Sequence, residues 1–299
     1  MTGMGLKLAA PAKVNLFLSV GRRRDDGFHD VSTVLTALSL HDTVTVTPAA
    51  GFSFVCEPEI AVFPERNLAC AAAVALSSSL ERPLAVALRV VKRLPVGGGL
   101  GGGSSDAAAV ILGLCSLWEV DPHSAVVRAV AARLGADVPF FLTGGTGLYK
   151  SRGDELVARM PTPEADIVVV DVGEPVSTAA VYAALDVAPS QVTEATGMVE
   201  ALQAGDLALI GSRLRNDLSA ASCGLLPSIA DALGMLGSSP GVLGAAMAGS
   251  GSCVFAIAES EDAAKAVADR ATVRGWRAWV TRTSPLGAVV TGDGDGGGE

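Results

Sequence analysis

The stretch LPVGGGLGGGSSDAAAV at residues 94–110 limits most strongly what this chain can fold into. Six of the seven residues from Gly97 to Gly103 are glycine. Glycine loses more backbone freedom on folding than any other residue, so an ordered segment of this kind is costly. The cost implies that something approaches this backbone too closely for side chains to fit. The candidates are another part of the protein, a tight turn and a phosphate chain.

The residues on either side of the glycines predict a strand–loop–helix unit. Residues 83–95 are rich in β-formers and end at Pro95. Beyond the loop, apolar residues recur at helical spacing, and Ser104 or Ser105 is a candidate N-cap. The loop N–H groups and the positive helix terminus would form an anion site, to which the serine hydroxyls add donors or a metal contact. Packing or a turn needs only one or two glycines, so a phosphate chain is the favoured interpretation.

Two known phosphate-loop patterns fit only in part. The GxGxxG pattern of dinucleotide-binding folds matches from Gly97 to Gly102, but it requires an acidic residue after the next strand. Glu119 has the right distance and lies instead at the end of the predicted helix. The GxxxxGK[ST] pattern fails because Gly103 stands where its lysine belongs. A phosphate chain held here therefore needs its fixed positive charge from elsewhere.

The length and composition indicate a globular protein of about two domains. A chain of 299 residues with 49% hydrophobic and 18% charged residues has ample material for a core. Two prolines near residue 160 interrupt both periodicities, which predicts an N-terminal domain over 1–160 and a C-terminal domain over 161–291. The low-complexity tail at 292–299 is expected to be disordered.

Charge and cysteine usage exclude several classes of protein. A net charge of −9 argues against a nucleic-acid binder. The 5 cysteines are odd in number and show no CxxC spacing, which favours reduced thiols over disulfides or a zinc site. No signal peptide or apolar membrane span is evident. We therefore expect a cytoplasmic protein with a small-molecule substrate, no nucleic-acid or membrane partner, and a monomeric or weakly homodimeric state.

Five motifs in order along the chain resemble those of the GHMP kinases. They are APAKVNLFLSVGRRRDDGFHDVSTV (10–34), PVGGGLGGGSSDAA (95–108), LGADVPFFLTGGTGL (134–148), RNDL (215–218) and AGSGSCVFA (248–256). The resemblance implies an α+β fold of two domains. These are a ribosomal-protein-S5-like N-terminal domain and a ferredoxin-like C-terminal domain, with the active site between them.

Within this family, the doubled glycine block and DGFH are most similar to the branch that acts on 4-diphosphocytidyl-2-C-methyl-D-erythritol. That branch transfers the γ-phosphoryl group of ATP to the 2-hydroxyl of its substrate in the non-mevalonate isoprenoid pathway. The resemblance assigns Lys13 and Asp137 as catalytic residues, and Lys13 would supply the missing positive charge. ATP chemistry implies Mg²⁺, and because the sequence shows no carboxylate cluster dedicated to this ion, we expect it to be held mainly by phosphate oxygens and water. The resemblance also assigns ATP binding to the loop residues Pro95, Val96, Gly97, Gly98, Gly99, Leu100, Gly101, Gly102, Gly103, Ser104 and Ser105.

The same resemblance places the acceptor substrate. Phe28 and His29 match its cytidine site, where an aromatic ring stacks on the base. Tyr182 is the candidate second aromatic residue, with Thr178 one helical turn earlier, and Asn15 is expected to bond the substrate. Core packing is the alternative for both Phe28 and Tyr182. The run RRRDD at 22–26 either attracts anionic substrates or forms a solvated loop.

Three other functions remain open at this point. One is a different GHMP kinase, such as a homoserine or mevalonate-type enzyme, although DGFH and the long glycine block argue against it. Another is a nucleotide-binding regulator without turnover, which would lack Lys13 or Asp137. The last is a dehydrogenase, on the basis of GxGxxG alone.

Overall fold

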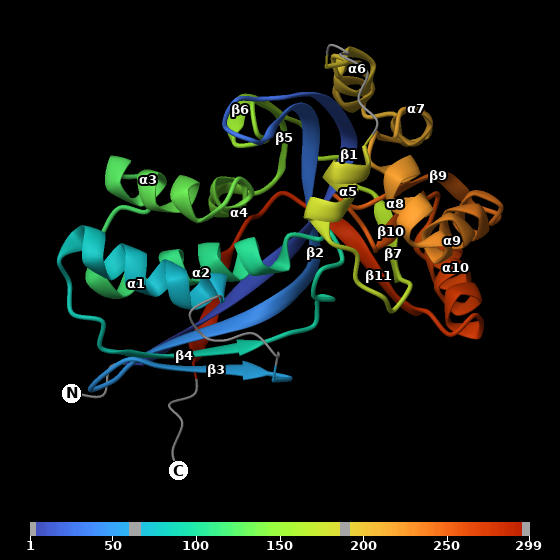
Figure 1. Cartoon of the computed structure of the whole chain (residues 1–299). Coiled ribbons are helices and arrows are strands. Elements are labelled where there is room, and N and C mark those ends of the chain that lie inside the picture. Colours follow the sequence, from blue (N-terminus) through green and yellow to red (C-terminus); the bar gives the residue numbers. More distant parts are fainter. Residues whose placement is uncertain (1–3, 60–66, 186–191, 295–299) are drawn as a thin grey trace.

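The protein is described by a computed structural model over residues 4–59, 67–185 and 192–294. Within these ranges the strands join in one continuous sheet, and strand β11 connects its N-terminal and C-terminal parts (Figure 1). The strands are β1 (Gly5–Arg23), β2 (His29–Pro48), β3 (Ser53–Glu57), β4 (Val86–Val91), β5 (Thr146–Lys150), β6 (Glu155–Met160), β7 (Asp166–Asp171), β8 (Arg215–Asn216), β9 (Val242–Met247), β10 (Val254–Ala258), β11 (Arg277–Ser284) and β12 (Val289–Gly294).

The N-terminal part is built on the long antiparallel pair β1–β2, covered on one face by four helices (Figure 1). The helix formed by residues 102–118 packs directly on both strands. Leu8, Val44, Ile111 and Phe140 are fully buried in the core between the helices and the sheet. The helices are α1 (Leu68–Leu80), α2 (Gly102–Trp118), α3 (Ala125–Leu134) and α4 (Val138–Thr143).

The C-terminal part has the order β11-β7-β10-β9, and each neighbouring pair is antiparallel. Along the chain, β7 precedes a helical segment, the pair β9–β10, a helix and β11, which is the ferredoxin-like arrangement. The predicted α+β fold, with an N-terminal part and a ferredoxin-like C-terminal part, is confirmed. The helices of this part are α5 (Thr178–Ala184), α6 (Thr196–Ala204), α7 (Leu207–Ser212), α8 (Ser219–Leu225), α9 (Pro227–Gly237) and α10 (Glu261–Val273).

The end of the described chain returns to the N-terminal sheet. Strand β12 pairs antiparallel with the start of β1, with Gly5 opposite Gly294. The expectation of a disordered tail over 292–299 is therefore wrong for residues 292–294, and 295–299 lie outside the described residues. The backbone N–H and C=O groups along this edge of β1 can pair with any extended segment, because strand pairing uses backbone groups. A glycine-rich segment of low complexity can therefore still form a strand here. No helix in the described ranges has the length and apolarity needed to cross a bilayer.

Candidate active site

The glycine loop joins the segment after β4 to the start of α2. Its carbonyl groups at Gly98 and Leu100 accept hydrogen bonds from the backbone N–H groups of Cys253 and Lys13, at 3.2 and 3.0 Å. The N–H groups of residues 99–104 donate to no acceptor within the part of the chain that the structure describes. They lie at the positive N-terminal end of a 17-residue helix. The predicted anion site thus has its donors in place.

Protein neighbours, however, account for much of the glycine content. A Cβ atom at Gly98, Gly99 or Gly101 would lie 2.5 Å from Cys253 Sγ, 1.9 Å from the Ala248 carbonyl oxygen and 2.7 Å from Phe141 Cζ, respectively. The inference that close packing needs only one or two of these glycines is therefore wrong. Gly103 differs, because a Cβ there would meet only Leu68 Cδ1, at 3.6 Å, and the residue is exposed.

The helix after the loop begins earlier than the serines predict. Gly101 occupies the N-cap position in a left-handed conformation, with φ 74°, so α2 starts at Gly102. Ser104 and Ser105 consequently lie inside the first turn. Ser104 lines the pocket beside the loop, whereas Ser105 is fully buried and its hydroxyl has no partner among the described residues. Of the predicted loop residues, Ser105 is the one that the structure does not bring to the pocket.

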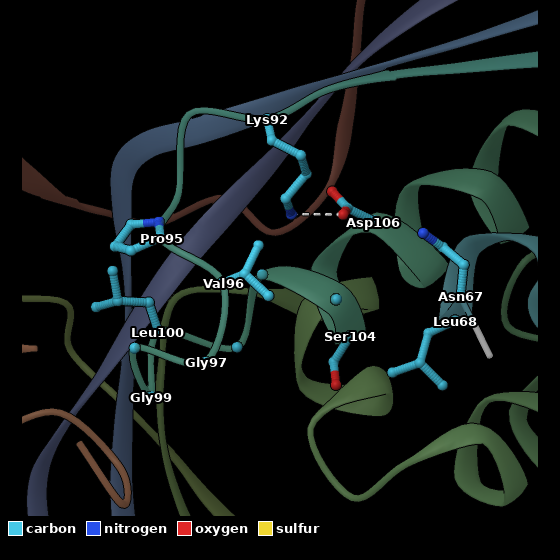
Figure 2. Close-up of a pocket in the computed structure, with 14 residues that line it drawn as sticks. Asn67, Leu68, Lys92, Pro95, Val96, Gly97, Gly99, Leu100, Ser104 and Asp106 are labelled. Carbon is cyan, nitrogen blue, oxygen red and sulfur yellow. Dashed lines mark hydrogen bonds and ion pairs between the residues drawn. The ribbon is translucent and has the colours of Figure 1, made fainter. Parts of the chain in front are cut away.

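Two pockets lie on either side of the loop and share Gly99 and Gly101 as a common wall. We call them the loop pocket and the acceptor pocket. The loop pocket, about 320 Å³, is lined by residues 95–104 with Asn67, Leu68, Lys92 and Asp106 (Figure 2). The acceptor pocket, about 280 Å³, contains Lys13, Asn15, Asp137, Thr178 and Tyr182 in its lining. Two ligands bound in them would therefore meet at the loop.

Lys13 and Asp137 lie together at this junction. Lys13 extends from β1 with only 5% of its side chain exposed, and its Nζ is 3.8 Å from Asp137 Oδ2. Asp137 occupies the N-cap position of α4, yet its side chain makes no capping hydrogen bond and is 32% exposed. Its carboxylate is therefore available to the acceptor pocket, and a buried ammonium stands beside it.

Asn15 is committed mainly to orienting this lysine. Its Oδ1 accepts from Lys13 Nζ at 2.9 Å and from the backbone N–H of Gly249 at 3.1 Å, while its Nδ2 donates to Thr33 Oγ1 at 2.9 Å. One N–H of the amide remains for a ligand in the acceptor pocket. The predicted substrate contact is thus compatible with the structure, and the positioning of Lys13 is an additional role that the sequence did not reveal.

The RNDL motif supports the same region from the C-terminal part. Asn216 donates through Nδ2 to the backbone carbonyls of Met247 and Gly249, at 2.8 and 2.7 Å. Its Oδ1 accepts from the N–H of Leu218, so the side chain is fixed at both ends. Strand β8, which carries Asn216, pairs with β1 just beyond Asn15. The loop after β9 is therefore held between elements of both parts of the chain.

The predicted cytidine-site residues form a partly connected group. The rings of His29 and Tyr182 are 5.1 Å apart at an interplanar angle of 38°, and Tyr182 and Thr178 line the acceptor pocket. Burial, and then the charge of Asp137, raise the pKa of Tyr182 to about 12, so its hydroxyl remains protonated. Phe28 is 55% exposed and does not line this pocket.

Arg152 is a candidate ligand residue that sequence reasoning missed. It lines the acceptor pocket, and its guanidinium carbon lies 5.1 Å from the centre of the Phe28 ring. Its charge is shared with Asp154, at 2.6 Å. Arg152 lies in the turn between β5 and β6, next to Gly153, which has a φ of 92°. Only a prediction of this β-hairpin from the sequence would have indicated that Arg152 reaches the pocket.

The arginine run at 22–24 does not make a free basic patch. Arg24 forms ion pairs with Asp26 at 3.2 Å and Asp30 at 3.1 Å. Arg23 donates to the carbonyl of Gly27 in the same turn. These contacts favour the interpretation of this segment as a self-neutralised, solvated loop.

The described residues contain no cluster of three or more His, Cys, Asp or Glu side chains that would hold a metal ion. The carboxylates that line the two pockets are those of Asp106 in the loop pocket and Asp137 in the acceptor pocket, and Ser104 adds a hydroxyl to the loop pocket. Such a sparse donor set suits a cation that keeps phosphate and water ligands, as Mg²⁺ commonly does.

This fold and loop define a class of small-molecule kinases. Residues 67–145 match the model "GHMP kinases N terminal domain", and residues 198–278 match "GHMP kinases C terminal". The chain belongs to the GHMP kinase family.

Within this family, the chain is similar over most of its length to enzymes that carry one name. The 4-diphosphocytidyl-2-C-methyl-D-erythritol kinase of Paenarthrobacter aurescens is 35% identical, over 96% of this chain and 96% of the relative. The enzyme of the same name from Geobacter sulfurreducens is 39% identical, over 93% and 99%. A crystal structure of 4-(cytidine 5'-diphospho)-2C-methyl-D-erythritol kinase is 36% identical, over 93% of this chain and 99% of that chain, with a TM-score of 0.79. Homoserine kinase from Cytophaga hutchinsonii, 20% identical over 96% and 98% with a TM-score of 0.76, shares the fold.

Proposed function

We propose that this chain transfers the γ-phosphoryl group of ATP to the 2-hydroxyl of 4-diphosphocytidyl-2-C-methyl-D-erythritol, releasing ADP. The observation that carries the proposal is the meeting of two pockets at Gly99 and Gly101, with Lys13 and Asp137 at the junction. The names of relatives at 35–39% identity over most of the chain support this substrate.

The geometry suggests how each group acts. ATP lies in the loop pocket with its phosphates on the free N–H groups of residues 99–104. The acceptor hydroxyl approaches from the other side of the loop, where Asp137 orients it and accepts its proton. Lys13 offsets the charge that spreads over the transferred group's oxygens. Phosphoryl transfer through a loose transition state needs mainly this positioning and charge stabilisation.

The diphosphate of the acceptor requires a cation that Lys13 does not supply, because Lys13 is occupied at the junction. Arg152, which also lines the acceptor pocket, would supply this cation. Its contact with Phe28 links the diphosphate subsite to the expected cytosine stack. His29 and Tyr182 then form the aromatic side of the base site.

Mg²⁺ would be held by the phosphate oxygens of ATP and water, with the Ser104 hydroxyl on the protein side. When bound, the ion would neutralise phosphate charge. The protein residues would remain responsible for orienting both substrates.

The structure bears on the alternatives as well. A dehydrogenase would need the strand after α2 to lie parallel beside β4. Instead β5 pairs antiparallel with β2, and Glu119 is the C-cap residue of α2. A regulator without turnover has no use for the Lys13–Asp137 pair that is present.

The proposal is tested by ADP release in a coupled assay. Release is expected only when the CDP-linked methylerythritol is added to enzyme, ATP and Mg²⁺, and ³¹P NMR of the product should show a new phosphomonoester. Homoserine and mevalonate serve as competing acceptors. Faster turnover of either one, or ADP release that does not depend on any acceptor, would overturn the assignment.

A further inference from the structure

The short helix that follows Asp137 places a phenylalanine against the glycine loop. In α4, which packs on α2 (Figure 1), the backbone N–H of Phe141 donates to the carbonyl of Asp137 at 3.3 Å. The two residues therefore lie one helical turn apart on the same face. A Cβ atom at Gly101 would lie 2.7 Å from Phe141 Cζ and 3.2 Å from Lys13 Cγ. The phenylalanine ring and the lysine stem thus both pack against the backbone of Gly101, in the space that a side chain there would fill.

This contact lies at the wall that the two pockets share. Gly101 lines both the loop pocket and the acceptor pocket, and Lys13 and Asp137 line the acceptor pocket. Phe141 is fully buried and lines neither of them. It can therefore influence a reaction at this wall only through the groups that it touches.

The carboxylate of Asp137 is not held firmly by contacts of its own. Its side chain makes no capping hydrogen bond, and the 3.8 Å from its Oδ2 to Lys13 Nζ is longer than a hydrogen bond. The place of the carboxylate therefore follows from the place of the α4 backbone.

The backbone of α4 is held at a second point by the segment between β11 and β12. The backbone N–H of Ala288 donates to the carbonyl of Phe141 at 2.7 Å. A Cβ atom at Gly287 would overlap this carbonyl oxygen, and one at Gly144 would overlap the backbone nitrogen of Gly287. Because the end of α4 is fixed against this segment, the size of the Phe141 ring sets how far the helix stands from Gly101.

The neighbouring Phe140 provides a matched comparison within the same helix. Both rings are fully buried in one core, and their centres lie 5.1 Å apart at an interplanar angle of 70°. The ring of Phe140 also meets that of Tyr149 from β5, at 5.9 Å. Of the three atoms nearest to a Cβ at Gly101, two belong to Phe141 and none to Phe140. Phe140 thus packs toward β5, and Phe141 packs toward the shared wall.

We propose that Phe141 is a positioning residue for phosphoryl transfer, whose ring sets the distance between the Asp137 carboxylate and the wall where the two substrates meet. The inference rests on the proposed function, in which Asp137 accepts the proton of the acceptor hydroxyl. A smaller side chain leaves a gap that α4 closes in part by moving toward Gly101. A displacement of about 1 Å can cost about 10²-fold in rate. The backbone N–H groups that hold ATP stay in place, so binding should change much less than turnover.

The first test compares Phe141→Leu with Phe140→Leu, because each replaces a fully buried ring by the same smaller side chain. Phe141→Leu should lower kcat about 30-fold, with both KM values within about threefold of the wild type. Phe140→Leu should lower Tm by a similar amount and keep kcat within about threefold of the wild type. Equal losses of kcat in the two variants, or a loss confined to KM in Phe141→Leu, would overturn the proposal.

A methionine variant covers the case in which the leucine variant does not fold. The unbranched side chain of Phe141→Met fills more of the space beside Gly101, so kcat should fall only about fivefold. Phe141→Met and Phe140→Met then take the places of the leucine variants in each test. A kcat of Phe141→Met no lower than that of Phe140→Met would overturn the proposal.

A double-mutant cycle shows whether Phe141 acts through Asp137. In Asp137→Asn the proton acceptor is already lost, so adding Phe141→Leu should lower the remaining rate by less than about threefold, as measured in single turnovers with labelled ATP. The same loss in both backgrounds would indicate general damage to the site and overturn the proposal. An Asp137→Asn enzyme with the kcat of the wild type would overturn it together with the role of Asp137.

Crystal structures of the two leucine variants separate this inference from the proposed function, because they do not depend on turnover. Compared with the wild type in the same crystal form, the Asp137 carboxylate should move by about 1 Å relative to Lys13 Nζ in Phe141→Leu and keep its place in Phe140→Leu. An unmoved carboxylate in Phe141→Leu would overturn the positioning role even when turnover is confirmed. A moved carboxylate in an enzyme that does not phosphorylate the CDP-linked substrate would instead count against the proposed function alone.

Discussion

The glycines of the loop should separate into two kinds when each is replaced by alanine. Gly99 has φ +77°, and a Cβ there would lie 1.9 Å from the backbone oxygen of Ala248. Gly103 lies within the first turn of α2 outside the left-handed region, and the nearest neighbour of its Cβ would be a flexible leucine at 3.6 Å. The alanine methyl group at residue 99 would therefore overlap rigid backbone, whereas the one at residue 103 would make an ordinary van der Waals contact.

The magnitudes follow from these two environments. For Gly99→Ala, the left-handed backbone costs about 1–2 kcal/mol, and relieving the overlap with a carbonyl adds about 1–3 kcal/mol. For Gly103→Ala, the better helix propensity stabilises the fold by about 0.5–1 kcal/mol. At roughly 2 °C per kcal/mol, Gly99→Ala should lower Tm by about 4–10 °C, whereas Gly103→Ala should raise it by about 1–2 °C.

The substitution at residue 103, which the fold tolerates, should nevertheless weaken the binding of ATP. The methyl group of Gly103→Ala enters the wall of the loop pocket, so KM for ATP should rise about tenfold in a protein that is no less stable than the wild type. Differential scanning calorimetry and initial-rate kinetics on the two variants check this. A Gly99→Ala protein as stable as the wild type, or a Gly103→Ala protein with unchanged KM for ATP, would refute the reasoning.

Four further outcomes are expected. Asp137→Asn should lower kcat about 10²–10⁴-fold with Tm unchanged, because it keeps the shape of the side chain and loses the proton acceptor; a kcat within twofold of the wild type would remove Asp137 from the mechanism. Arg152→Met should raise KM for the acceptor about tenfold and leave KM for ATP unchanged, since the residue lines only the acceptor pocket; steady-state kinetics in both substrates distinguish this from a general loss. Asn216→Ala leaves two backbone carbonyls without their donor and should destabilise the protein by about 1–3 kcal/mol in urea unfolding, with Asn216→Asp as the comparison of similar shape. Because burial raises the pKa of the Asp106 carboxyl to about 7 in the folded protein, the native state holds a proton that the unfolded chain has released above about pH 4. Stability should therefore fall between pH 5 and pH 8, and Asp106→Asn should lessen that fall, as measured by Tm at the two pH values.

The local pattern around the loop was readable from the sequence because each signal there is short-range. Pro95, the glycine run and the apolar spacing of residues 107–118 predicted a strand, a loop and a helix, and β4 and α2 occupy those places. The continuous apolar run within residues 165–172 is typical of a strand covered on both faces, and β7 occupies this segment. The motif resemblance assigned Lys13 and Asp137 to one site, and in the structure Lys13 Nζ lies 3.8 Å from Asp137 Oδ2.

What the sequence did not reveal depends on distant partners. The requirement for glycine at residue 99 comes from Ala248, which is far along the chain. Arg152 reaches the acceptor pocket through a short hairpin that has no strong periodicity. Lys92 and Asp106 looked like ordinary members of a strand end and a helix, and only their convergence on Asp42 shows that they form a buried charged cluster. The pairing of β12 with β1 likewise leaves no mark in a segment rich in glycine and aspartate.

That last pairing has a consequence for how the protein is made. Strand β12 is translated after every other described element, yet it completes the sheet that begins with β1. While the ribosome is still synthesising the second half, the first half must wait with one flank of its sheet uncovered. Domains generally fold as units, the N-terminal one first during synthesis, and unpaired strand edges make such intermediates prone to aggregation. In this protein the edge of β1 is covered only after β12 has been synthesised. A chaperone that binds exposed strand edges would act on the chain before that point.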